Sequence, residues 1–177
     1  MKSLILLLSI SALVLAKVEI AKVCPEGWTW FERSRGGWCM KVFSDSGLIA
    51  NAEAKCAALG AVVSGSQNAK EIDWMLDTAV NTLKMPTNTA LFIGAKRTQR
   101  CLKEFLTKDC SQLNSFSWTD NLTVGISGFR WLAGEPNNSG GNQDCIQLIL
   151  DRRVMDDITC GLTVLGGYTC GKVATFE

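Results

Sequence analysis

Eight cysteines constrain this chain of 177 residues more than any other feature. They stand at positions 24, 39, 56, 101, 110, 145, 160 and 170. An even number of cysteines in an oxidising environment indicates a disulfide framework, and eight of them allow about 100 pairings. A zinc site is the usual alternative, but the chain contains no histidine and no CxxC pair. We therefore expect a domain held by disulfides, whose connectivity the spacing alone leaves open.

The N-terminal sequence predicts secretion. Lys2 is followed by an apolar run, SLILLLSISALVLA, which ends in the small residue Ala16. A positive charge, a short apolar run and a small residue at the cleavage position are typical of a signal peptide, and the run is too short for a membrane span. We expect a signal peptide over residues 1–16 and an extracellular mature chain without a membrane anchor.

Charge and composition indicate one domain that does not bind nucleic acid. The chain has 18 Lys and Arg residues and 17 Asp and Glu residues, so the mature part, which lacks Lys2, is formally neutral. Attraction to nucleic acid or to an anionic membrane requires a marked positive charge. No linker, charge block or repeat divides the sequence. We expect a short N-terminal segment over 17–23, one domain over 24–172 and a C-terminal tail over 173–177.

Hydrophobic periodicity predicts two helices followed by strands. In IANAEAKCAALG, the residues at helical spacing are Ile49, Ala52, Cys56 and Leu59. In NAKEIDWMLDTAVNTLK, a fuller apolar stripe consists of Ile72, Met75, Leu76, Ala79, Val80 and Leu83. From Leu91 onward, short apolar runs between loop residues predict strands in LFIGA, SFSW, FRWL, CIQLIL and YTCG. The expected fold class is α+β.

Taken in order, a series of short motifs resembles the C-type lectin-like domain. The motifs are CPEGWTWF, WCMKVF, AEAKCAALGAVV, FIGA, FSWTD, GEPNN, DCIQL, MDDITC and YTC. Their order and spacing carry the resemblance, which spans Cys24 to Lys172. It implies two helices, antiparallel sheets and a long calcium-binding loop, stapled by disulfides.

The resemblance also implies the disulfide pairing. In this family the helix cysteine pairs with the last cysteine, and the two cysteines that flank the binding loop pair with each other. The long form of the domain adds a bridge in an N-terminal hairpin, which leaves the other two cysteines to close a local loop. The implied pairs are Cys56 with Cys170, Cys145 with Cys160, Cys24 with Cys39, and Cys101 with Cys110.

The resemblance assigns a calcium site to the loop AGEPNNSGGNQDC and to MDDITC. Sugar-binding members hold one ion through an EPN tripeptide, an acidic residue a few positions later and an Asn-Asp pair. The matching positions are Glu135, Asn137, Gln143, Asp156 and Asp157. Gln143 replaces a Glu and Asp156 replaces an Asn, so the two departures cancel in charge. The set keeps three carboxylates and two amides, which suit a hard cation that prefers oxygen ligands.

One position and one segment also differ from other members of the family. Met155 stands where a Trp packs in relatives, and Met fills a similar apolar site. A second calcium site, present in some relatives, is not expected here. The segment from Arg97 to Cys110 is basic where acidic ligands would be needed.

The resemblance implies sugar binding of the mannose type. The EPN order places a carboxylate acceptor at Glu135 and an amide donor at Asn137, which exchange hydrogen bonds with two sugar hydroxyls. Galactose-type members carry the reverse polarity, QPD. We expect calcium-dependent binding of glycans or glycoproteins that present mannose, glucose, fucose or N-acetylglucosamine. The expected sugar-binding residues are Glu135, Asn137, Gln143 and Asp156.

Two other classes of function stay open. Many domains with this resemblance bind a protein ligand without calcium, and a fold does not fix a function. Glycoside hydrolysis needs two carboxylates that flank a bond, which Glu135, Asp156 and Asp157 could supply in number. The chain has no histidine and the family offers no precedent for hydrolysis, so we do not expect an enzyme.

Two sequons predict where a glycan could be attached. Asn121-Leu122-Thr123 lies in a predicted turn, so we expect glycosylation at Asn121. Asn137-Asn138-Ser139 is formally a second sequon. A glycan on Asn137 would remove a calcium ligand, so glycosylation there and sugar binding exclude each other.

Overall fold

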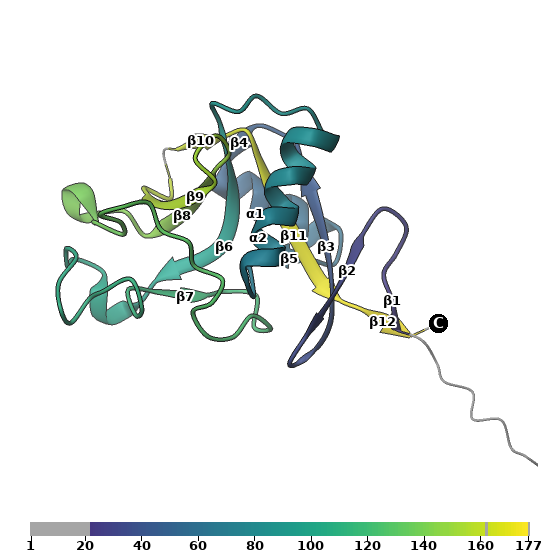
Figure 1. Cartoon of the computed structure of the whole chain (residues 1–177), viewed down its shortest axis with the longest axis horizontal. Helices are drawn as coiled ribbons and strands as arrows, with labels where there is room; N and C mark the ends of the chain where they lie inside the picture. The colour runs from purple at the N-terminus through teal and green to yellow at the C-terminus, as the bar shows by residue number, and fades with distance from the viewer. Residues whose placement is uncertain (1–21, 162, 177) are drawn as a thin grey trace, which may run out of the picture.

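The computed structural model describes residues 22–161 and 163–176 (Figure 1). The expected signal peptide lies outside the described residues, as do residues 17–21 of the segment 17–23. Within the described part, no helix combines the length and the apolar character that a membrane crossing requires.

Helix α1 (Ile49–Ala58) forms where the first apolar pattern predicts it. Its buried residues are Ile49, Ala52 and Cys56. Leu59, which was expected on the same face, is 44% exposed. The helix ends at Ala58 and Leu59 follows it as the cap residue, so the side chain leaves the buried face.

Helix α2 (Ala69–Asp77) begins at Asn68, whose side chain accepts a hydrogen bond from the backbone N–H of Glu71 at 3.1 Å. This contact satisfies one of the N–H groups that a helix start leaves without a partner. A π-helical turn over Thr78–Thr82 continues the helix. The predicted apolar stripe of both segments faces the main core.

Most strands belong to one mixed sheet. They are β2 (Thr29–Arg33), β3 (Gly36–Phe43), β5 (Val62–Val63), β6 (Ala90–Arg97), β7 (Phe116–Trp118), β8 (Cys145–Ile149), β9 (Val154–Ile158) and β11 (Gly167–Val173). Among the described residues the order is β2-β3-β11-β6-β8-β9, with β5 paired to β11 and β7 to β6. Antiparallel pairing holds apart from β11 and β6, which are parallel. Parallel neighbours need a crossover connection, and the long excursion between these two strands supplies it.

The run FRWL is not a strand, although its apolar pattern predicted one. It makes a single isolated bridge, between Trp131 and Met155. Phe129 and Trp131 stack on each other with ring centroids 5.4 Å apart, and Trp131 also contacts Phe116. Aromatic stacking therefore fixes the segment that leads into the loop before β8.

Two short sheets complete the fold. Strand β4 (Gly47–Leu48) pairs with β10 (Val164–Leu165), and β1 (Lys22–Val23) pairs with β12 (Thr175–Phe176). The second pair brings the two ends of the described chain together, as Figure 1 shows. The paired structure thus reaches beyond residues 24–172 at both ends.

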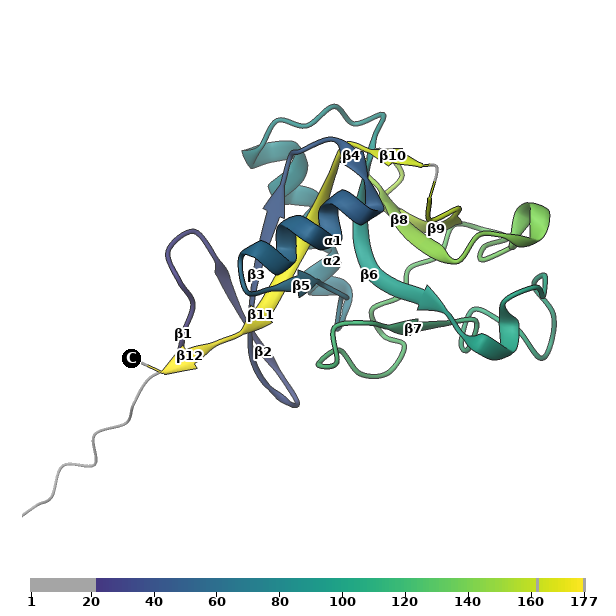
Figure 2. The same ribbon diagram turned by 180° about the vertical axis from the view of Figure 1, so that it is seen from behind.

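The two helices cover opposite faces of the large sheet (Figures 1 and 2). Alternate residues of β6 face the two cores, as expected for a strand. Leu91 and Ile93 pack on the side of α2, while Ala90 and Phe92 pack on the side of α1. Each large apolar side chain buried in this way contributes roughly 1.5–3 kcal/mol.

The disulfides join the pairs that the resemblance implies: Cys24–Cys39, Cys56–Cys170, Cys101–Cys110 and Cys145–Cys160. Cys56–Cys170 ties α1 to β11 across 114 residues. Cys145–Cys160 joins the start of β8 to the end of the β9 segment, beside the long loop. Four bridges in one domain fit an oxidising, extracellular environment.

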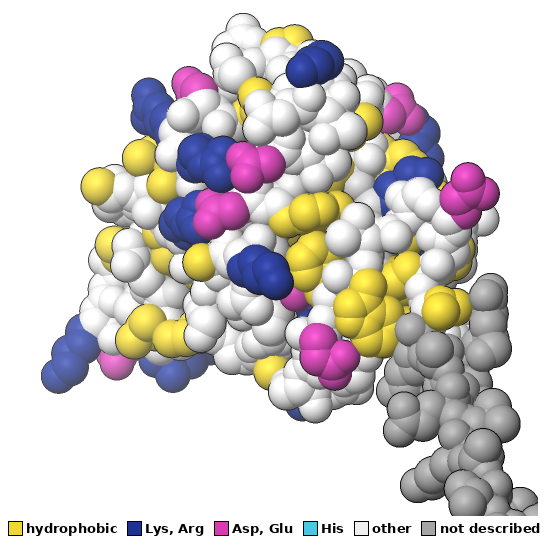
Figure 3. All heavy atoms as spheres, turned by 45° about the vertical axis from the view of Figure 1, so that its right-hand side comes forward, with side chains coloured by type: hydrophobic (Ala, Val, Ile, Leu, Met, Phe, Trp, Pro, Cys, Tyr) yellow, Lys and Arg dark blue, Asp and Glu magenta, His cyan; other side chains and the backbone are white. Residues whose placement is uncertain are grey.

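Charges of opposite sign are mixed on the surface. On the face in Figure 3, Lys and Arg side chains lie beside Asp and Glu side chains. Among the described residues, Arg130 and Arg153 both pair with Asp73, and Arg153 also pairs with Asp77. The mixture agrees with the near-neutral charge of the chain.

Candidate functional site

Three carboxylates meet beside the loop that precedes β8. Asp156 and Asp157 are neighbours on β9, and Glu135 lies in the loop. One oxygen of each lies within 4.8 Å of the other two. Pairing with β8 places Asp156 opposite Gln147 and Asp157 opposite Ile146, so the two aspartates project from opposite faces of the strand. Asp157 is fully buried, whereas Asp156 is partly buried.

The turn at Glu135 sets an acceptor beside a donor. The peptide bond between Glu135 and Pro136 is cis. The backbone N–H of Asn137 donates to Glu135 Oε2 at 2.8 Å and to Asp157 Oδ1 at 3.0 Å. The side-chain amide of Asn137 donates to Glu135 Oε1 at 2.8 Å. A carboxylate acceptor and an amide donor therefore lie next to each other, in the order that the EPN tripeptide led us to expect.

Gln143 brings an unused acceptor to the same place. Its Nε2 donates to the backbone carbonyl of Asp157 at 2.7 Å. Its Oε1 is buried and has no hydrogen-bond partner among the described residues. Buried acceptors are rarely left without a partner. The structure thus brings together all five residues of the expected site: Glu135, Asn137, Gln143, Asp156 and Asp157.

Among the described residues, neither Glu135 nor Asp156 forms an ion pair, although Arg152 lies near enough to lower the pKa of Asp156 slightly. Burial raises the pKa of Glu135 above its ordinary value of 4.5, and the carboxylates of Asp157 and Asp156 raise it further. Burial also raises the pKa of Asp156 above 3.8, although Gln147 opposes this by donating to Asp156 Oδ2 at 3.1 Å. A raised carboxyl pKa means that the ionised form is disfavoured in its surroundings. A cation bound between these groups would remove that penalty.

Arg97 lies at the site, and the sequence analysis did not identify it there. It ends β6, and its side chain is fully buried. Its guanidinium pairs with Asp157 Oδ2, and its Nε donates to the backbone carbonyl of Gln143 at 2.9 Å. Nε also lies 3.5 Å from Asp144 Oδ1. The ring of Phe116 lies against the guanidinium, with 4.6 Å from its centroid to Cζ.

The alternation of residues along β6 indicates that the side chain of Arg97 points inward. Leu91, Ile93 and Ala95 all face the main core, and every second residue of a strand points to the same face. Arg97 occupies the next inward position. A charged residue there indicates a buried partner of opposite sign.

Asn138 anchors the loop from beneath. Its side chain is fully buried, and its backbone has a left-handed φ of 53°, which Asn tolerates better than most residues. Its N–H donates to Asp157 Oδ2 at 2.8 Å, and its Oδ1 accepts from the N–H of Gln143 at 2.9 Å. Its amide donates to the carbonyl of Glu104 at 3.0 Å. From the sequence, Asn138 was placed in the polar loop and in a sequon, but this anchoring role was not predicted.

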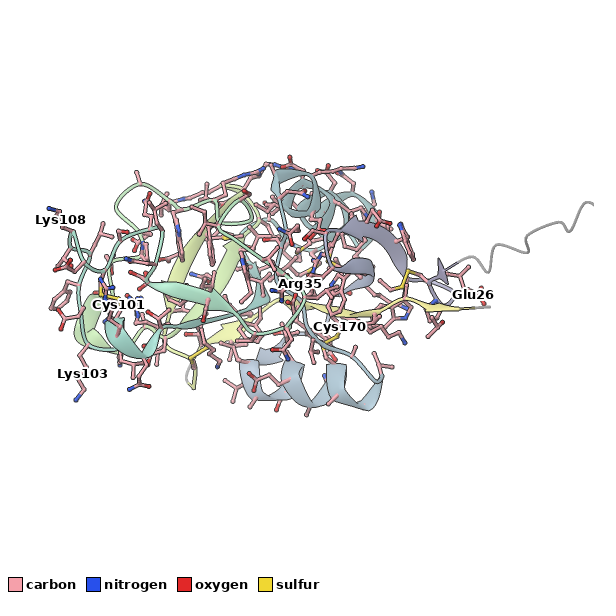
Figure 4. The ribbon with its side chains drawn as sticks, turned by 90° about the horizontal axis from the view of Figure 1, so that it is seen from below. Glu26, Arg35, Cys101, Lys103, Lys108 and Cys170 are labelled. Carbon is pink, nitrogen blue, oxygen red and sulfur yellow. A yellow bond between two sulfur atoms is a disulfide. The ribbon has the colours of Figure 1, made fainter. Side chains whose placement is uncertain are left out.

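Glu104 lies in the loop closed by Cys101 and Cys110, so Asn138 joins this loop to the candidate site. Figure 4 places Cys101, with Lys103 and Lys108, at the end of the molecule that is remote from Glu26. Gln112, which follows the same loop, donates to the backbone carbonyl of Glu135 at 2.6 Å. The disulfide-closed loop therefore forms one side of the site.

The donor set fits calcium. It offers three clustered carboxylates, two of them with raised pKa values, and the unpartnered Oε1 of Gln143. Calcium takes six to eight oxygen ligands and accepts carboxylate, amide and backbone oxygens together. Met155 packs under the site with 0% exposure, as its apolar character predicted. The residues that would hold the ion are Glu135, Asn137, Gln143, Asp156 and Asp157.

The expected glycosylation position lies elsewhere. Asn121 is exposed in the turn after β7 and has a left-handed φ of 61°. Its backbone carbonyl accepts a hydrogen bond from Arg35 at 3.3 Å. The hydroxyl of Thr123 is buried and donates to Asp120.

Comparison with known proteins points to one family. The sequence model described as C-type lectin domain-containing protein 141/158 matches residues 30–171. The mouse low affinity immunoglobulin epsilon Fc receptor is 24% identical, over 93% of this chain and 42% of the receptor. Ladderlectin of Oncorhynchus mykiss is 27% identical, over 78% of this chain and 63% of ladderlectin. The chain thus spans less than two thirds of either relative.

Solved structures share the fold. The carbohydrate-recognition domain of cow CD23, determined in the presence of a GlcNAc2Man3 oligosaccharide, has a TM-score of 0.62 and 21% identity, and the match covers 88% of this chain and 99% of that one. A calcium-independent type II antifreeze protein has a TM-score of 0.61 and 21% identity, with coverage of 88% and 98%. At such identities the likeness shows the architecture alone.

Proposed function

This chain belongs to the C-type lectin domain family, many of whose members bind carbohydrate, and on this premise we propose that it is a secreted protein that binds mannose-type glycans with calcium. The observation that carries the proposal is the convergence of Glu135, Asp156 and Asp157 within 4.8 Å. These residues come from two distant parts of the chain, and two of them have raised pKa values. Such a cluster favours a divalent cation.

Different side chains of this protein would make different contacts with the sugar. Glu135 and Asp156 offer carboxylate oxygens that accept hydrogen bonds from sugar hydroxyls, and the amide of Asn137 donates one. Calcium, when bound, supplies direct coordination of two neighbouring hydroxyls on one ring. The acceptor and donor at Glu135 and Asn137 lie side by side, which supports the mannose-type order. Affinity for one sugar ring should be weak, on the order of millimolar, because the buried area is small and the contacts are polar.

Relatives support this proposal by analogy. The cow CD23 domain was solved in the presence of an oligosaccharide, and the C-type lectin domain of murine dendritic cell inhibitory receptor 2 was solved in complex with an N-glycan. Both have the fold of this chain, with TM-scores of 0.62 and 0.59. The proposed partners are accordingly glycans or glycoproteins.

A calcium-independent domain that binds a protein ligand is the second candidate. The observation that favours it is the buried pair between Arg97 and Asp157, because a cation already contacts one of the expected calcium ligands. A calcium-independent antifreeze protein among the structural relatives shows that this fold persists without the ion. Binding that survives removal of calcium would favour this candidate.

The test is retention of the disulfide-bonded protein on immobilised mannose, with calcium and then with a chelator. Asp156→Ala should abolish retention, because it removes every oxygen that this position offers to the ion and to the sugar. Asp151→Ala is the matched control, since Asp151 is exposed in the turn between β8 and β9 and lies outside the cluster. Free mannose should elute the protein at lower concentration than free galactose. If the protein is not retained and calcium does not raise its melting temperature, the proposal is wrong.

A further inference from the structure

Arg97 brings a positive charge into a site that is expected to hold a metal ion. We infer that Arg97 is the built-in cation of this loop: its guanidinium neutralises Asp157 and keeps the loop folded without calcium, and it thereby limits calcium affinity. The first half of the inference is independent of the proposed function. The second half rests on the proposed calcium site.

The contacts of Asp157 show how the loop is held. Its Oδ1 accepts from the N–H of Asn137 at 3.0 Å, and its Oδ2 accepts from the N–H of Asn138 at 2.8 Å and from the guanidinium of Arg97. Asn137 and Asn138 are consecutive residues of the loop. Asp157 thus fixes the first arm of the loop, and Arg97 fixes Asp157.

Arg97 also holds the second arm of the loop directly. Its Nε donates to the backbone carbonyl of Gln143 at 2.9 Å and lies 3.5 Å from Asp144 Oδ1. Both arms therefore converge on one guanidinium. The planar group, with donors in fixed directions, suits such a bridging position better than a lysine would.

Burial makes the charge of Arg97 necessary. The side chains of Arg97 and Asp157 are both 0% exposed. A buried carboxylate that loses its partner retains the full cost of its lost hydration, and salt does not screen it. Without calcium, Arg97 is the cation in contact with Asp157 among the described residues. The loop can therefore keep its shape in the calcium-free protein.

The ion pair between Arg97 and Asp157 also weakens the attraction of the Asp157 carboxylate for calcium. A carboxylate that already contacts one cation attracts a second cation less strongly, because the two positive charges repel at short range. Arg97 Nη1 is also buried and has no hydrogen-bond partner in the described part of the chain, so the contacts that hold the guanidinium leave one of its donors unused. The charge of Arg97 thus offsets one of the three clustered carboxylates.

The test compares Arg97→Gln with the unchanged protein in calcium titrations followed by melting temperature and by calorimetry. Arg97→Gln should lower the melting temperature without calcium by about 10 °C, because Asp157 loses its buried partner. It should also bind calcium about tenfold more tightly, a typical coupling between neighbouring sites. Saturating calcium should restore most of the lost melting temperature. Arg153→Gln is the matched control, since it removes an arginine from exposed ion pairs away from the loop.

A second variant separates charge from packing. Arg97→Gln combined with Asp157→Asn removes both charges, so the melting temperature without calcium should recover while the response to calcium is lost. If the double variant stays as unstable as Arg97→Gln, the packing of Arg97 against Phe116 is what matters and the inference is wrong. Calcium affinity that is unchanged or weaker in Arg97→Gln would also overturn it.

The outcomes separate this inference from the proposed function. If the unchanged protein gives no response to calcium but Arg97→Gln does, the inference holds and the proposed calcium-dependent function fails. If the unchanged protein binds calcium and Arg97→Gln binds it no better, the function stands and the inference fails. If neither protein binds calcium, the proposed function and the second half of the inference both fail, and the first half then stands or falls on whether Arg97→Gln lowers the melting temperature without calcium.

Discussion

The side-chain amide of Asn137 donates to the carboxylate of Glu135 at 2.8 Å. The pair defines an order of acceptor and donor along the edge of the site. Exchanging the two groups, with Glu135→Gln and Asn137→Asp together, should shift preference from mannose toward galactose. The measurement is inhibition of retention by each free sugar. Asn142→Asp in the same loop is the control. Loss of mannose binding without gain of galactose binding would show that this order does not select the sugar.

Gln143→Glu should strengthen calcium binding by about tenfold, because charge count and site geometry set calcium affinity. The buried Oε1 of Gln143 has no hydrogen-bond partner among the described residues, so a carboxylate oxygen at this position is free to coordinate the ion. Without calcium, the variant should melt at lower temperature than the unchanged protein, since a fourth carboxylate joins the cluster. Calcium titrations followed by melting temperature measure both effects. Gln99→Glu, at an exposed position, should change neither.

Calcium affinity should fall as the pH is lowered toward the ordinary carboxyl range. Burial raises the folded-state pKa of Glu135 above 4.5 and that of Asp156 above 3.8. At a pH between the ordinary and the raised carboxyl pKa values, the calcium-free folded state therefore holds protons that the unfolded chain has released. Its stability decreases as the pH rises through this interval. Calcium binding expels these protons, so its affinity rises with pH over the same interval and is constant above it.

Calorimetric calcium titrations across that interval measure the effect. In Asp156→Asn, the remaining calcium affinity should depend less on pH, because one of the two carboxyl groups with a raised pKa is gone. Affinity that does not change with pH below neutrality would mean that neither Glu135 nor Asp156 contacts the ion.

Removing one partner from a buried ion network outside the site should destabilise the protein strongly. Arg33 pairs with Glu71 at 2.6 Å and with Asp120 at 3.3 Å, and all three side chains are at most 1% exposed. Arg33→Met leaves both carboxylates unpaired and should cost about 3–5 kcal/mol or more. Arg35→Met, at an exposed position of the same hairpin, should stay within about 0.5 kcal/mol. Denaturant unfolding compares the two, and equal losses would contradict the prediction.

A secreted preparation should carry a glycan at Asn121 and none at Asn137. Asn121 is exposed in a turn, whereas the amide of Asn137 is bonded to Glu135. Peptide mass mapping identifies the modified position. Asn121→Gln should remove the glycan and leave retention on mannose unchanged. A glycan on Asn137 would contradict both this prediction and the proposed role of Asn137.

Local patterns predicted the fold well where one face of an element is buried. The stripe of Ile72, Met75 and Leu76 reports the buried face of α2 directly. The strand prediction for FRWL was wrong because apolar residues at alternate positions also suit aromatic stacking, as Phe129 and Trp131 show. The parallel pair of β11 and β6 could not be read from either strand, since direction depends on the path of the chain between them.

The candidate site, like the fold, was predicted from the sequence only in part. Its oxygen donors were found because a tripeptide and a strand motif keep them close in sequence. Arg97 was missed because its partner Asp157 is 60 residues away, and the basic segment that begins at Arg97 gave only a reason to expect no acidic ligands. Asn138 was missed because its role depends on a left-handed backbone and on the carbonyl of Glu104.

The pairing of β1 with β12 has a practical consequence for how the molecule can be displayed. Both ends of the described chain leave from one pole, and the loop that holds Cys101, Lys103 and Lys108 lies at the other (Figures 1 and 4). A bead, sensor chip or fusion partner attached through either end therefore leaves the proposed binding face pointing outward. Dense arrays of copies anchored in this way would engage a many-branched glycan surface in parallel, which turns weak single contacts into firm adhesion.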